Sequence, residues 1–315
     1  GLLTKTEVLA EIARLNANGG LDTSFQEGLS GADGDIHSLA LEAGGKVLLG
    51  GYFTSVNGVS RNGIARLELD GALDDSFQHG LTGVGGYPPY SSYYPYVRSV
   101  LCCSDGKVLL GGNFGTVNGE VRNRVAKLNS DGTLDGFQNG AAGADYMVTS
   151  VAVQSDARVL VGGSFINMSN EKRSGIARLL ANGTLDSTFQ NGMAGVVGQV
   201  HAILPQSDGK ILIGGGLISV NGVARANLAR LHANGALDEG FLNGLAGPDS
   251  SVESITLQTD GKVLIGGWFT TVNGLSRNRI ARLNADGTVD LDFLDGLAGA
   301  NAVVNAVLLQ TDGRM

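Results

Sequence analysis

Short apolar runs alternate with polar, glycine-containing turns along the whole chain, and this alternation repeats itself. Each repeat contains an apolar run that ends in a Gly-Gly pair, and the pairs lie at 50–51, 111–112, 162–163, 214–215 and 266–267. Between successive pairs the pattern predicts four short strands joined by hairpin turns, with no stretch of helical periodicity. Several such units in one chain are typical of an all-β protein, the β-propeller, in which each four-stranded antiparallel unit forms one blade.

The copy between Val263 and Phe293 shows the unit most clearly. Strand A is predicted just before it, at 252–258, and an Asp-Gly-Lys turn follows. Strand B ends in Gly-Gly-x-Phe, and the B–C connection carries Val-Asn-Gly and an arginine. Strand C reads Ile-Ala-Arg-Leu and leads into an Asn-Gly or Asp-Gly turn, for which type I′ is expected. The short strand D carries an aspartate and a phenylalanine, here Asp290 and Phe293.

The two ends of the chain carry complementary parts of one unit. Residues 11–15 fit strand C and 304–310 fit strand A, so we expect a closed six-bladed propeller, not an open solenoid, with one blade shared between the N- and C-termini. The shared blade is five residues short and lacks a clear strand B. Either 1–10 supplies that strand, or the chain is a piece of a longer protein with flanking repeats or domains. The expected single domain, 1–315, divides into 31–82, 83–142, 143–194, 195–246 and 247–299, with the shared blade made from 1–30 and 300–315.

These units resemble the delta-60 repeat, a β-propeller repeat of large bacterial secreted and surface proteins. The matching motifs are Asp-Gly-Lys, Gly-Gly-x-Phe, Val-Asn-Gly, Ile-Ala-Arg-Leu and Asn-x-Asp-Gly-x-Leu-Asp, and together they cover nearly the whole chain. The resemblance implies a propeller and an extracellular or cell-surface location in a bacterium. It implies no particular function, because propellers serve in binding, scaffolding and catalysis.

The charge composition restricts the possible partners. A net charge of −8 and a pI near 5.0 argue against nucleic acid or an anionic membrane. Most lysines and arginines recur at three positions of the repeat, so they form a ring, not a patch. No apolar run is long enough to span a membrane, so we expect no membrane insertion. The only cysteines, Cys102 and Cys103, are adjacent in a predicted strand and are expected to be free thiols.

The crossover from strand D to the next strand A is longer in the second unit than in the others. Its extra residues bring a segment rich in tyrosine and proline. Tyrosine offers a flat surface with a polar tip and proline stiffens a loop, which is the composition of recognition loops. Packing as a cap on the propeller rim is the alternative. The candidate ligand-binding tyrosines of this crossover and the next are Tyr87, Tyr90, Tyr93, Tyr94, Tyr96 and Tyr146.

One position near the start of strand A differs from unit to unit although its neighbours are alike. It is expected at the mouth of the axial channel, and its occupants are His37, Arg98, Thr149, His201, Glu253 and Asn305. In a six-bladed ring His37 and His201 face each other, so together with Glu253 they could offer a metal two imidazoles and a carboxylate. We favour a hydrated polar ring, because no third ligand follows a known spacing. His37, Arg98, His201 and Glu253 are therefore candidates for ligand binding, and no metal site is assigned.

The repeated charged residues are expected to serve the fold. The C–D turns read Asn-x-Asp-Gly-x-x-Asp, as at 129–135, which is similar to a calcium loop, but two carboxylates are too few for that ion. The aspartate of strand D is expected to pair with the arginine of the B–C connection, or to cap a neighbouring backbone, and so to link blades. That arginine recurs at Arg61, Arg122, Arg173, Arg225 and Arg277.

Taken together, these features favour a non-catalytic recognition module that binds a glycan, peptide or protein through the D–A crossovers and the channel mouth. No catalytic motif stands out, and no cofactor is expected. Two alternatives stay open. One is a metal-assisted hydrolase or lyase that uses His37, His201 and Glu253 in the channel. The other is a structural protein that assembles by completing its shared blade between chains.

Overall fold

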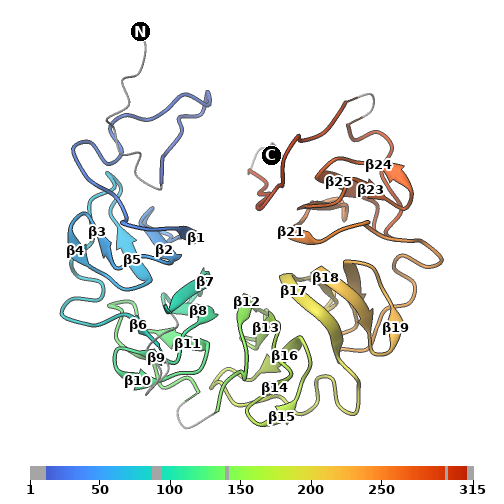
Figure 1. The fold of residues 1–315 in the computed structure, drawn as a ribbon, viewed down its shortest axis with the longest axis horizontal. Helices are drawn as coiled ribbons and strands as arrows, with labels where there is room; N and C mark the ends of the chain where they lie inside the picture. Colours follow the sequence, from blue (N-terminus) through green and yellow to red (C-terminus); the bar gives the residue numbers. More distant parts are fainter. Residues whose placement is uncertain (1–11, 87–93, 139–141, 295–296, 311–315) are drawn as a thin grey trace. The chain divides into compact units, whose positions relative to one another are not determined.

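The computed structural model describes residues 12–86, 94–138, 142–294 and 297–310. Every helix or strand in this part is a β-strand, from β1 to β25, which confirms the all-β prediction (Figure 1). The chain forms two compact units, Gly1–Gly143 and Ala144–Met315. The division lies within one residue of the boundary expected between two blades. Whether the two ends of the chain complete one shared blade stays a prediction.

Each blade is built on an antiparallel sheet in which strand B pairs with strand A on one side and strand C on the other. We name a blade after its strand A. Strand A is β1 (Ile36–Leu41), β7 (Tyr96–Cys102), β12 (Val148–Val153), β17 (Val196–Pro205) or β21 (Val252–Leu257). Strand B is β2 (Val47–Gly51), β8 (Val108–Asn113), β13 (Val159–Gly163), β18 (Ile211–Val220) or β22 (Val263–Gly267). Strand C is β5 (Ile64–Leu67), β11 (Val125–Leu128), β16 (Ile176–Leu179), β20 (Leu228–Leu231) or β25 (Ile280–Leu283).

The fourth strand, D, is reduced to a single bridged pair in these blades. In the β1 blade Leu67 pairs with Leu73, and the chain then turns away. It turns because the Asp74 carboxylate accepts hydrogen bonds from both the backbone N and the hydroxyl of Ser76, which competes with a continued ladder. The turn buries Phe77 completely. The corresponding pairs are Leu128–Leu134, Leu179–Leu185, Leu231–Leu237 and Leu283–Val289.

The B–C connection forms a small hairpin that the sequence did not predict. In the β1 blade β3 (Ser55–Val56) and β4 (Val59–Ser60) are joined by Asn57 and Gly58, whose φ angles of 50° and 75° give a type I′ turn. The other hairpins are β9 (Thr116–Val117) with β10 (Glu120–Val121), β14 (Asn167–Met168) with β15 (Glu171–Lys172), β18 with β19 (Val223–Ala224), and β23 (Thr271–Val272) with β24 (Leu275–Ser276). In addition, β6 (Val84–Gly85) pairs with β9.

The expectation of type I′ geometry in the C–D turns was wrong. In the turn at 129–133 only Gly132 has a positive φ, 86°, and its backbone N donates to Asn129 O at 2.9 Å. This is a type I turn closed by a left-handed glycine, which suits a loop one residue longer than a two-residue hairpin. Asp131 Oδ1 accepts from Thr133 N and Thr133 Oγ1, at 2.9 and 2.6 Å, so this carboxylate orders the turn.

Neighbouring atoms approach both glycines of the Gly-Gly pair so closely that a side chain would not fit at either position. In the β21 blade a Cβ on Gly267 would overlap the carbonyl oxygen of Ser251 on the partner strand. A Cβ on Gly266 would lie 2.7 Å from a methyl group of Val304, which packs there from the next repeat. The second glycine therefore serves pairing within the blade, and the first serves packing between blades.

The segment 304–310 lies against the β21 blade in the place of the next strand A. Val307 N donates to Ser254 Oγ at 2.9 Å, and Thr256 Oγ1 donates to Val307 O at 2.6 Å. The same kind of contact joins β1 and β7, where Val100 N donates to Ser38 Oγ at 3.0 Å. The C-terminal segment is thus placed as the predicted strand A, although the described part of the structure gives it no ladder.

Blades pack through fully buried side chains from strands B and C and from the two repeated phenylalanines. Phe77 and Phe114 belong to the same cluster, which joins residues of the β1 and β7 blades. Equivalent clusters join the β12 and β17 blades and the β17 and β21 blades. Each buried phenylalanine contributes about 2 kcal/mol through burial of apolar surface.

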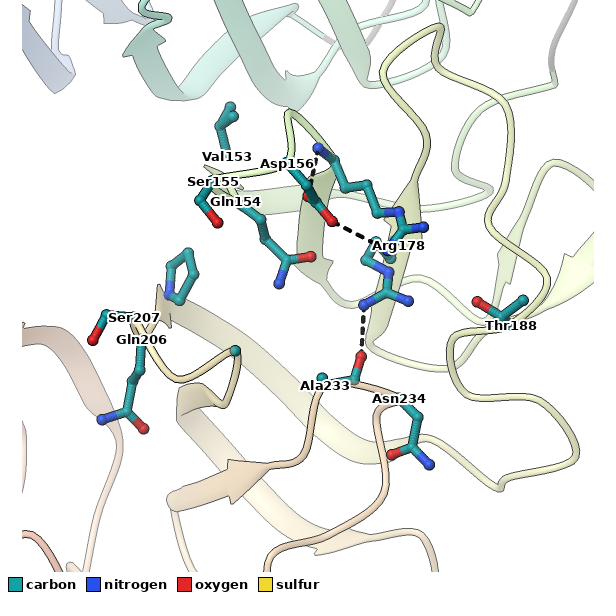
Figure 2. A pocket seen from close by; sticks show the side chains of 13 residues that line it. Val153, Gln154, Ser155, Asp156, Arg178, Thr188, Gln206, Ser207, Ala233 and Asn234 are labelled. Atoms are coloured by element: carbon teal, nitrogen blue, oxygen red, sulfur yellow. Dashed lines mark hydrogen bonds and ion pairs between the residues drawn. The ribbon is translucent and has the colours of Figure 1, made fainter.

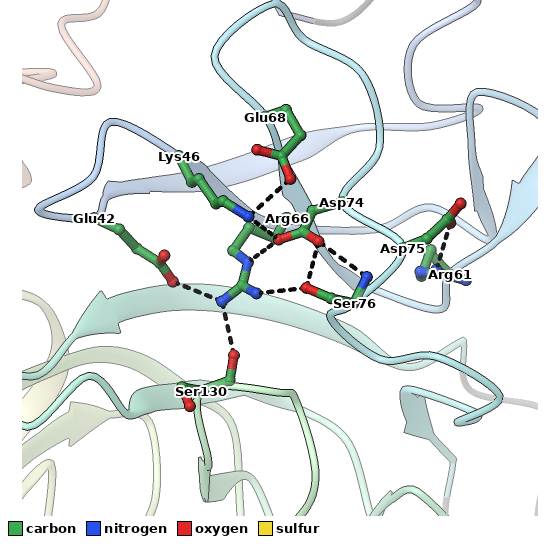
Figure 3. Close-up of polar contacts among 9 residues, drawn as sticks. All are labelled: Glu42, Lys46, Arg61, Arg66, Glu68, Asp74, Asp75, Ser76 and Ser130. Atoms are coloured by element: carbon green, nitrogen blue, oxygen red, sulfur yellow. Dashed lines mark hydrogen bonds and ion pairs between the residues drawn. The ribbon is translucent and has the colours of Figure 1, made fainter.

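A charged cluster on the outer side of the β1 blade links it to the next blade (Figure 3). Arg66 Nε donates to Asp74 Oδ2 at 2.7 Å, and its Nη1 donates to Ser130 O of the β7 blade at 2.7 Å. Lys46 Nζ also reaches Asp74, at 2.7 Å, and the Arg66 guanidinium lies 4.7 Å from the centre of the Phe77 ring. Burial alone would raise the pKa of Asp74, but its hydrogen bonds from Lys46, Ser76 and Arg66 outweigh burial and lower it strongly.

This cluster corrects the predicted pairing of the repeated aspartate. Its partner is the arginine of Ile-Ala-Arg-Leu, not the arginine of the B–C connection. Arg61, the B–C arginine, instead donates to its neighbour Ser60 O at 2.8 Å and pairs with the exposed Asp75 at 3.3 Å. The reason is register: strand C brings Arg66 directly beside the bridged pair that precedes Asp74, whereas Arg61 lies at the far end of the blade.

The residue after the strand D phenylalanine supplies a second link between blades. Gln78 has a φ of 60°, its N donates to Asp131 O at 2.9 Å, and its Nε2 donates to Gly132 O at 2.7 Å. Gln190 makes the same pair of bonds to Asn234 O and Gly235 O. The C–D glycine must lack a Cβ because this glutamine backbone approaches it closely. The turn glycine therefore has a role between blades as well as within the turn.

Candidate functional site

The variable position near the start of strand A is a β-bulge in all five blades. Between β1 and β2 the register shifts between Ile36 and Ser38, and the other four A–B pairs shift at the equivalent place. A bulge leaves one residue outside the ladder and re-aims its side chain, and bulges are frequent beside binding and active sites. The residues left out of the ladder are His37, Arg98, Thr149, His201 and Glu253.

Two of these bulge residues, His201 and Glu253, meet across neighbouring blades of the second unit. His201 Nδ1 lies 3.0 Å from Glu253 Oε2, and His201 Nε2 lies 3.1 Å from Gln199 Oε1. Ser251 Oγ donates to Glu253 Oε1 at 2.8 Å and lies 3.2 Å from His201 Nδ1. The side chains of both bulge residues are largely buried. The structure therefore brings His201 and Glu253 within hydrogen-bonding distance, and their role in ligand binding stays a prediction.

The arrangement differs from a catalytic triad. A triad places the nucleophile and the orienting carboxylate on opposite ring nitrogens of the histidine. Here Ser251 and Glu253 share Nδ1, and Gln199 faces Nε2. The cluster instead presents oxygen and nitrogen atoms in fixed positions, which suits hydrogen bonding to a ligand.

A residue with an exposed aromatic side chain is bonded to this cluster through its backbone. Trp268, the only tryptophan, follows the Gly-Gly pair of β22, and its backbone N donates to Ser251 O at 2.9 Å. Its side chain is 52% exposed, and Arg279 donates to its carbonyl oxygen. Sequence reasoning missed Trp268, Ser251 and Gln199. The sequence could have indicated Trp268, because it occupies the x position of Gly-Gly-x-Phe, and the residue at this position changes from unit to unit.

A second aromatic group lies in the first unit at the corresponding end of the blades. The His37 ring stands edge-on to Tyr96, with centroids 5.6 Å apart, and Tyr52 makes a similar contact with Tyr94, also at 5.6 Å. Burial lowers the pKa of His37, and the nearby Arg98 lowers it further. His37 therefore lies beside Tyr96, and Arg98 is near enough to His37 to affect its pKa.

The other candidate residues are placed as follows. Tyr94 is 70% exposed and Tyr146 is 61% exposed. Thr149 is buried, and its hydroxyl donates to Gly162 O and Val200 O, so this bulge residue serves packing. Tyr87, Tyr90 and Tyr93 lie outside the described residues. His37 and His201 belong to different units, and their expected meeting across the channel stays a prediction.

Within the described residues, no group of three or more His, Cys, Asp or Glu side chains could hold a metal ion. His201 and Glu253 supply one imidazole and one carboxylate. A metal-assisted reaction at this place therefore needs a ligand from elsewhere.

The two cysteines are free thiols. Burial raises the pKa of Cys102 to about 11, and the neighbouring Glu42 and Cys103 contribute in the same direction. Burial also raises the pKa of Cys103. Neither thiol has the low pKa of a nucleophilic cysteine.

Three D–A crossovers carry an aspartate that ties them to the B–C hairpin of the same blade. Asp33 accepts from the backbone N of Thr54 and of Ser55, at 2.7 and 2.9 Å, and Asp145 and Asp249 make equivalent bonds. The β7 and β17 blades have no aspartate there, and the crossover pairs through its backbone instead. The loops that frame the bulge residues are therefore held in place in every described blade.

A family model described as "Domain of unknown function (DUF5122) beta-propeller" matches residues 8–25, 45–77, 103–136, 154–189, 206–241 and 258–293. The six matched segments correspond to the six predicted repeats. No curated protein matches the chain. In the described part of the chain we find no helix with the length and apolar character that crossing a membrane requires.

Solved structures with low sequence identity share the fold. The WD40 β-propeller domain of Doa1 is 14% identical with a TM-score of 0.54, and the match covers 90% of this chain and 75% of that one. The extracellular domain of BT4673 from B. thetaiotaomicron is 13% identical with a TM-score of 0.53, over 96% of this chain and 36% of that one. Virginiamycin B lyase from Staphylococcus aureus is 15% identical with a TM-score of 0.50, over 83% and 71%. At these identities the likeness shows the β-propeller fold alone.

Proposed function

Because the chain belongs to the DUF5122 β-propeller family, whose fold leaves function open, we propose from its own residues that it is a non-catalytic recognition module. It binds a glycan, peptide or protein at the end of the blades that carries the bulge residues and the D–A crossovers. The single observation that carries the proposal is the β-bulge at the strand A position whose residue changes in charge and polarity between repeats.

The physical argument starts from what a repeat needs for folding. Residues that only hold blades together recur, as the Arg–Asp pair and the Gly-Gly pair do. The bulge position lies outside the ladder, so its residue can differ in each blade, and binding requires that asymmetry. His201, Glu253 and Gln199 offer polar atoms in fixed positions, and Trp268, whose ring is exposed, is bonded through its backbone to Ser251 of the same cluster. Rigid aromatic surface beside convergent polar groups is typical of recognition sites.

The cellular location is inferred from the family resemblance. We propose that the resemblance to the delta-60 repeat extends to an extracellular or cell-surface location. The fold shared with an extracellular bacterial domain supports this proposal. Antibody labelling of intact and permeabilised cells of the encoding organism tests it, and labelling only after permeabilisation would contradict it.

The binding proposal is tested with immobilised glycan and peptide arrays, followed by calorimetry with the ligand found. Two variants, Trp268→Ala and the double change His201→Ala with Glu253→Ala, should weaken binding at least tenfold. Thr259→Ala is the matched control, because it is exposed at the opposite end of the same blade. An unchanged Kd in both variants, or no ligand on either array, would refute the proposal.

A separate variant distinguishes recognition from capping by the tyrosines. Tyr94→Ala removes an exposed ring whose ring contact is with Tyr52. Recognition predicts weaker binding with an unchanged thermal midpoint. A lowered midpoint with unchanged binding would support the capping role instead.

A further inference from the structure

The second unit contains a pocket at the other end of its blades, away from the bulge residues. Its volume is about 610 Å³, within the range of small-ligand sites (Figure 2). One wall is the A–B hairpin of the β12 blade, and the facing walls are the A–B and C–D hairpins of the β17 blade. The residues used in the argument are Gln154, Asp156, Arg158, Arg178, Gln206 and Asn234.

The β12 hairpin departs from the repeat where it borders this pocket. The other described A–B turns place glycine at the left-handed position, whereas this turn places Ala157 there, with a φ of 64°. Alanine is strained in this region and glycine is not. Backbone strain of this kind is found more often at functional sites than elsewhere.

The next residue departs as well, since arginine replaces the usual lysine. The lysines reach the aspartate of strand D closely, for example Lys262 Nζ to Asp290 Oδ2 at 2.7 Å. Arg158 Nε is 3.6 Å from Asp186 Oδ2, and its Nη1 pairs with Asp156 Oδ2 at 3.1 Å.

Arg158 therefore keeps donor capacity that is not committed to the aspartate of strand D. Among the described residues its Nη2 has no partner, and its side chain is 40% exposed. Arg178, in contrast, uses its guanidinium on Asp186 at 2.8 Å and on Ala233 O at 2.6 Å. Asp156 and Asp186 pair with these two arginines. Because Arg178 is buried, Arg158 supplies the exposed cationic edge of the lining. A planar guanidinium edge recognises a carboxylate through two parallel hydrogen bonds.

The rest of the lining is rich in neutral polar groups. The side-chain oxygens of Gln154 and Gln206 are buried and have no hydrogen-bonding partner among the described residues. These two glutamines come from different walls of the pocket (Figure 2). Rotation of either amide towards the pocket would allow its oxygen to accept a hydrogen bond from a hydroxyl group of a ligand. Gln258 has the same unpartnered oxygen in the next repeat, but Lys262 stands there in place of the arginine.

We propose that this pocket binds a saccharide that carries a carboxylate. Arg158 pairs with the carboxylate, and Gln154 and Gln206 accept hydrogen bonds from sugar hydroxyls. The site is independent of the recognition surface at the bulge residues and uses different side chains. It accounts together for the strained Ala157 and the lysine-to-arginine change.

The test is calorimetric titration of the whole protein with tri-D-galacturonate and with the neutral trigalactoside. The acidic sugar should bind, and the neutral one should bind at least tenfold more weakly. Arg158→Lys should raise the Kd for the acidic sugar at least tenfold. Lys262→Arg is the matched control in the neighbouring repeat and should leave binding unchanged. Arg158→Lys should fold normally, because lysine stands at this position in other repeats.

Three outcomes would overturn the proposal. These are no binding of tri-D-galacturonate at millimolar concentration, equal affinity for the two sugars, and an unchanged Kd in Arg158→Lys. Ala157→Gly adds a readout independent of the ligand, because relief of strain should raise the thermal midpoint. A lowered midpoint would remove the strain argument.

Discussion

Replacement of Asp238 by asparagine tests how much the repeated charged cluster stabilises a blade. Asp238 Oδ2 accepts from Arg230 Nε at 2.7 Å and from Lys210 Nζ at 3.0 Å, and Oδ1 accepts from Gly240 N at 3.1 Å. Burial raises the pKa of Asp238, but bonds from Arg230 and Lys210 dominate and lower it from 3.8 to about 2. A difference of this size between folded and unfolded states corresponds to about 2 kcal/mol at neutral pH.

The sign of the pH dependence follows from the lowered pKa. Because Asp238 binds its proton less readily when folded, its stabilisation is fully present above about pH 5 and is lost as the pH falls from about 4 towards 2. In urea unfolding Asp238→Asn should therefore be less stable than the wild type by about 2 kcal/mol at pH 7. The difference should shrink steadily below about pH 4.

Glu239→Gln provides the matched control, since Glu239 is the adjacent residue and is exposed. Its unfolding free energy should change by less than about 0.5 kcal/mol at every pH. The reasoning would be refuted if Asp238→Asn were as stable as the wild type at pH 7. It would also be refuted if the difference persisted undiminished at pH 2.

Three further predictions concern packing, thiol chemistry and metal content. Gly267→Ala should cost about 2 kcal/mol or more in urea unfolding, because its Cβ would overlap a backbone carbonyl, whereas Gly136→Ala, with free space around it, should change stability by less than about 1 kcal/mol. Equal effects would show that the close approach is not rigid. Cys102, with a pKa near 11, should react with iodoacetamide at pH 8 far more slowly than glutathione, and similar rates would contradict its burial. Elemental analysis should find no stoichiometric metal, and one equivalent that disappears in His201→Ala would favour the hydrolase or lyase hypothesis instead.

The β-bulge explains why a single position of the repeat is free to carry function. Residues on either side of it, such as Val200 and Ala202, face Gly215 and Gly214 in the ladder and are constrained by pairing. His201 lies outside that ladder, so its side chain can change without loss of the sheet. The same geometry in every described blade means that exchange of bulge residues should alter specificity more than stability.

Several features of this protein could be predicted from the sequence because their causes are local or recur. The apolar alternation, the glycine in each turn and the order of strands A, B and C depend on residues close in the chain. The repeat also places equivalent residues at equivalent positions of successive blades, and this placement brings His201 beside Glu253. The order of strands A, B and C holds in the structure wherever its described residues test it, whereas one A–B turn has Ala157 in place of glycine.

Tertiary structure decided the contacts that depend on register and on side-chain reach. The sequence offered two arginines as partners for Asp74, and only the placement of strand C beside the bridged pair selects Arg66. The reduction of strand D to one pair and the bulge at His201 arise from strand pairing within a blade, and the pocket beside Arg158 arises where hairpins of two successive blades meet. A pattern of residue types fixes which segments form strands, but packing between strands fixes which atoms meet.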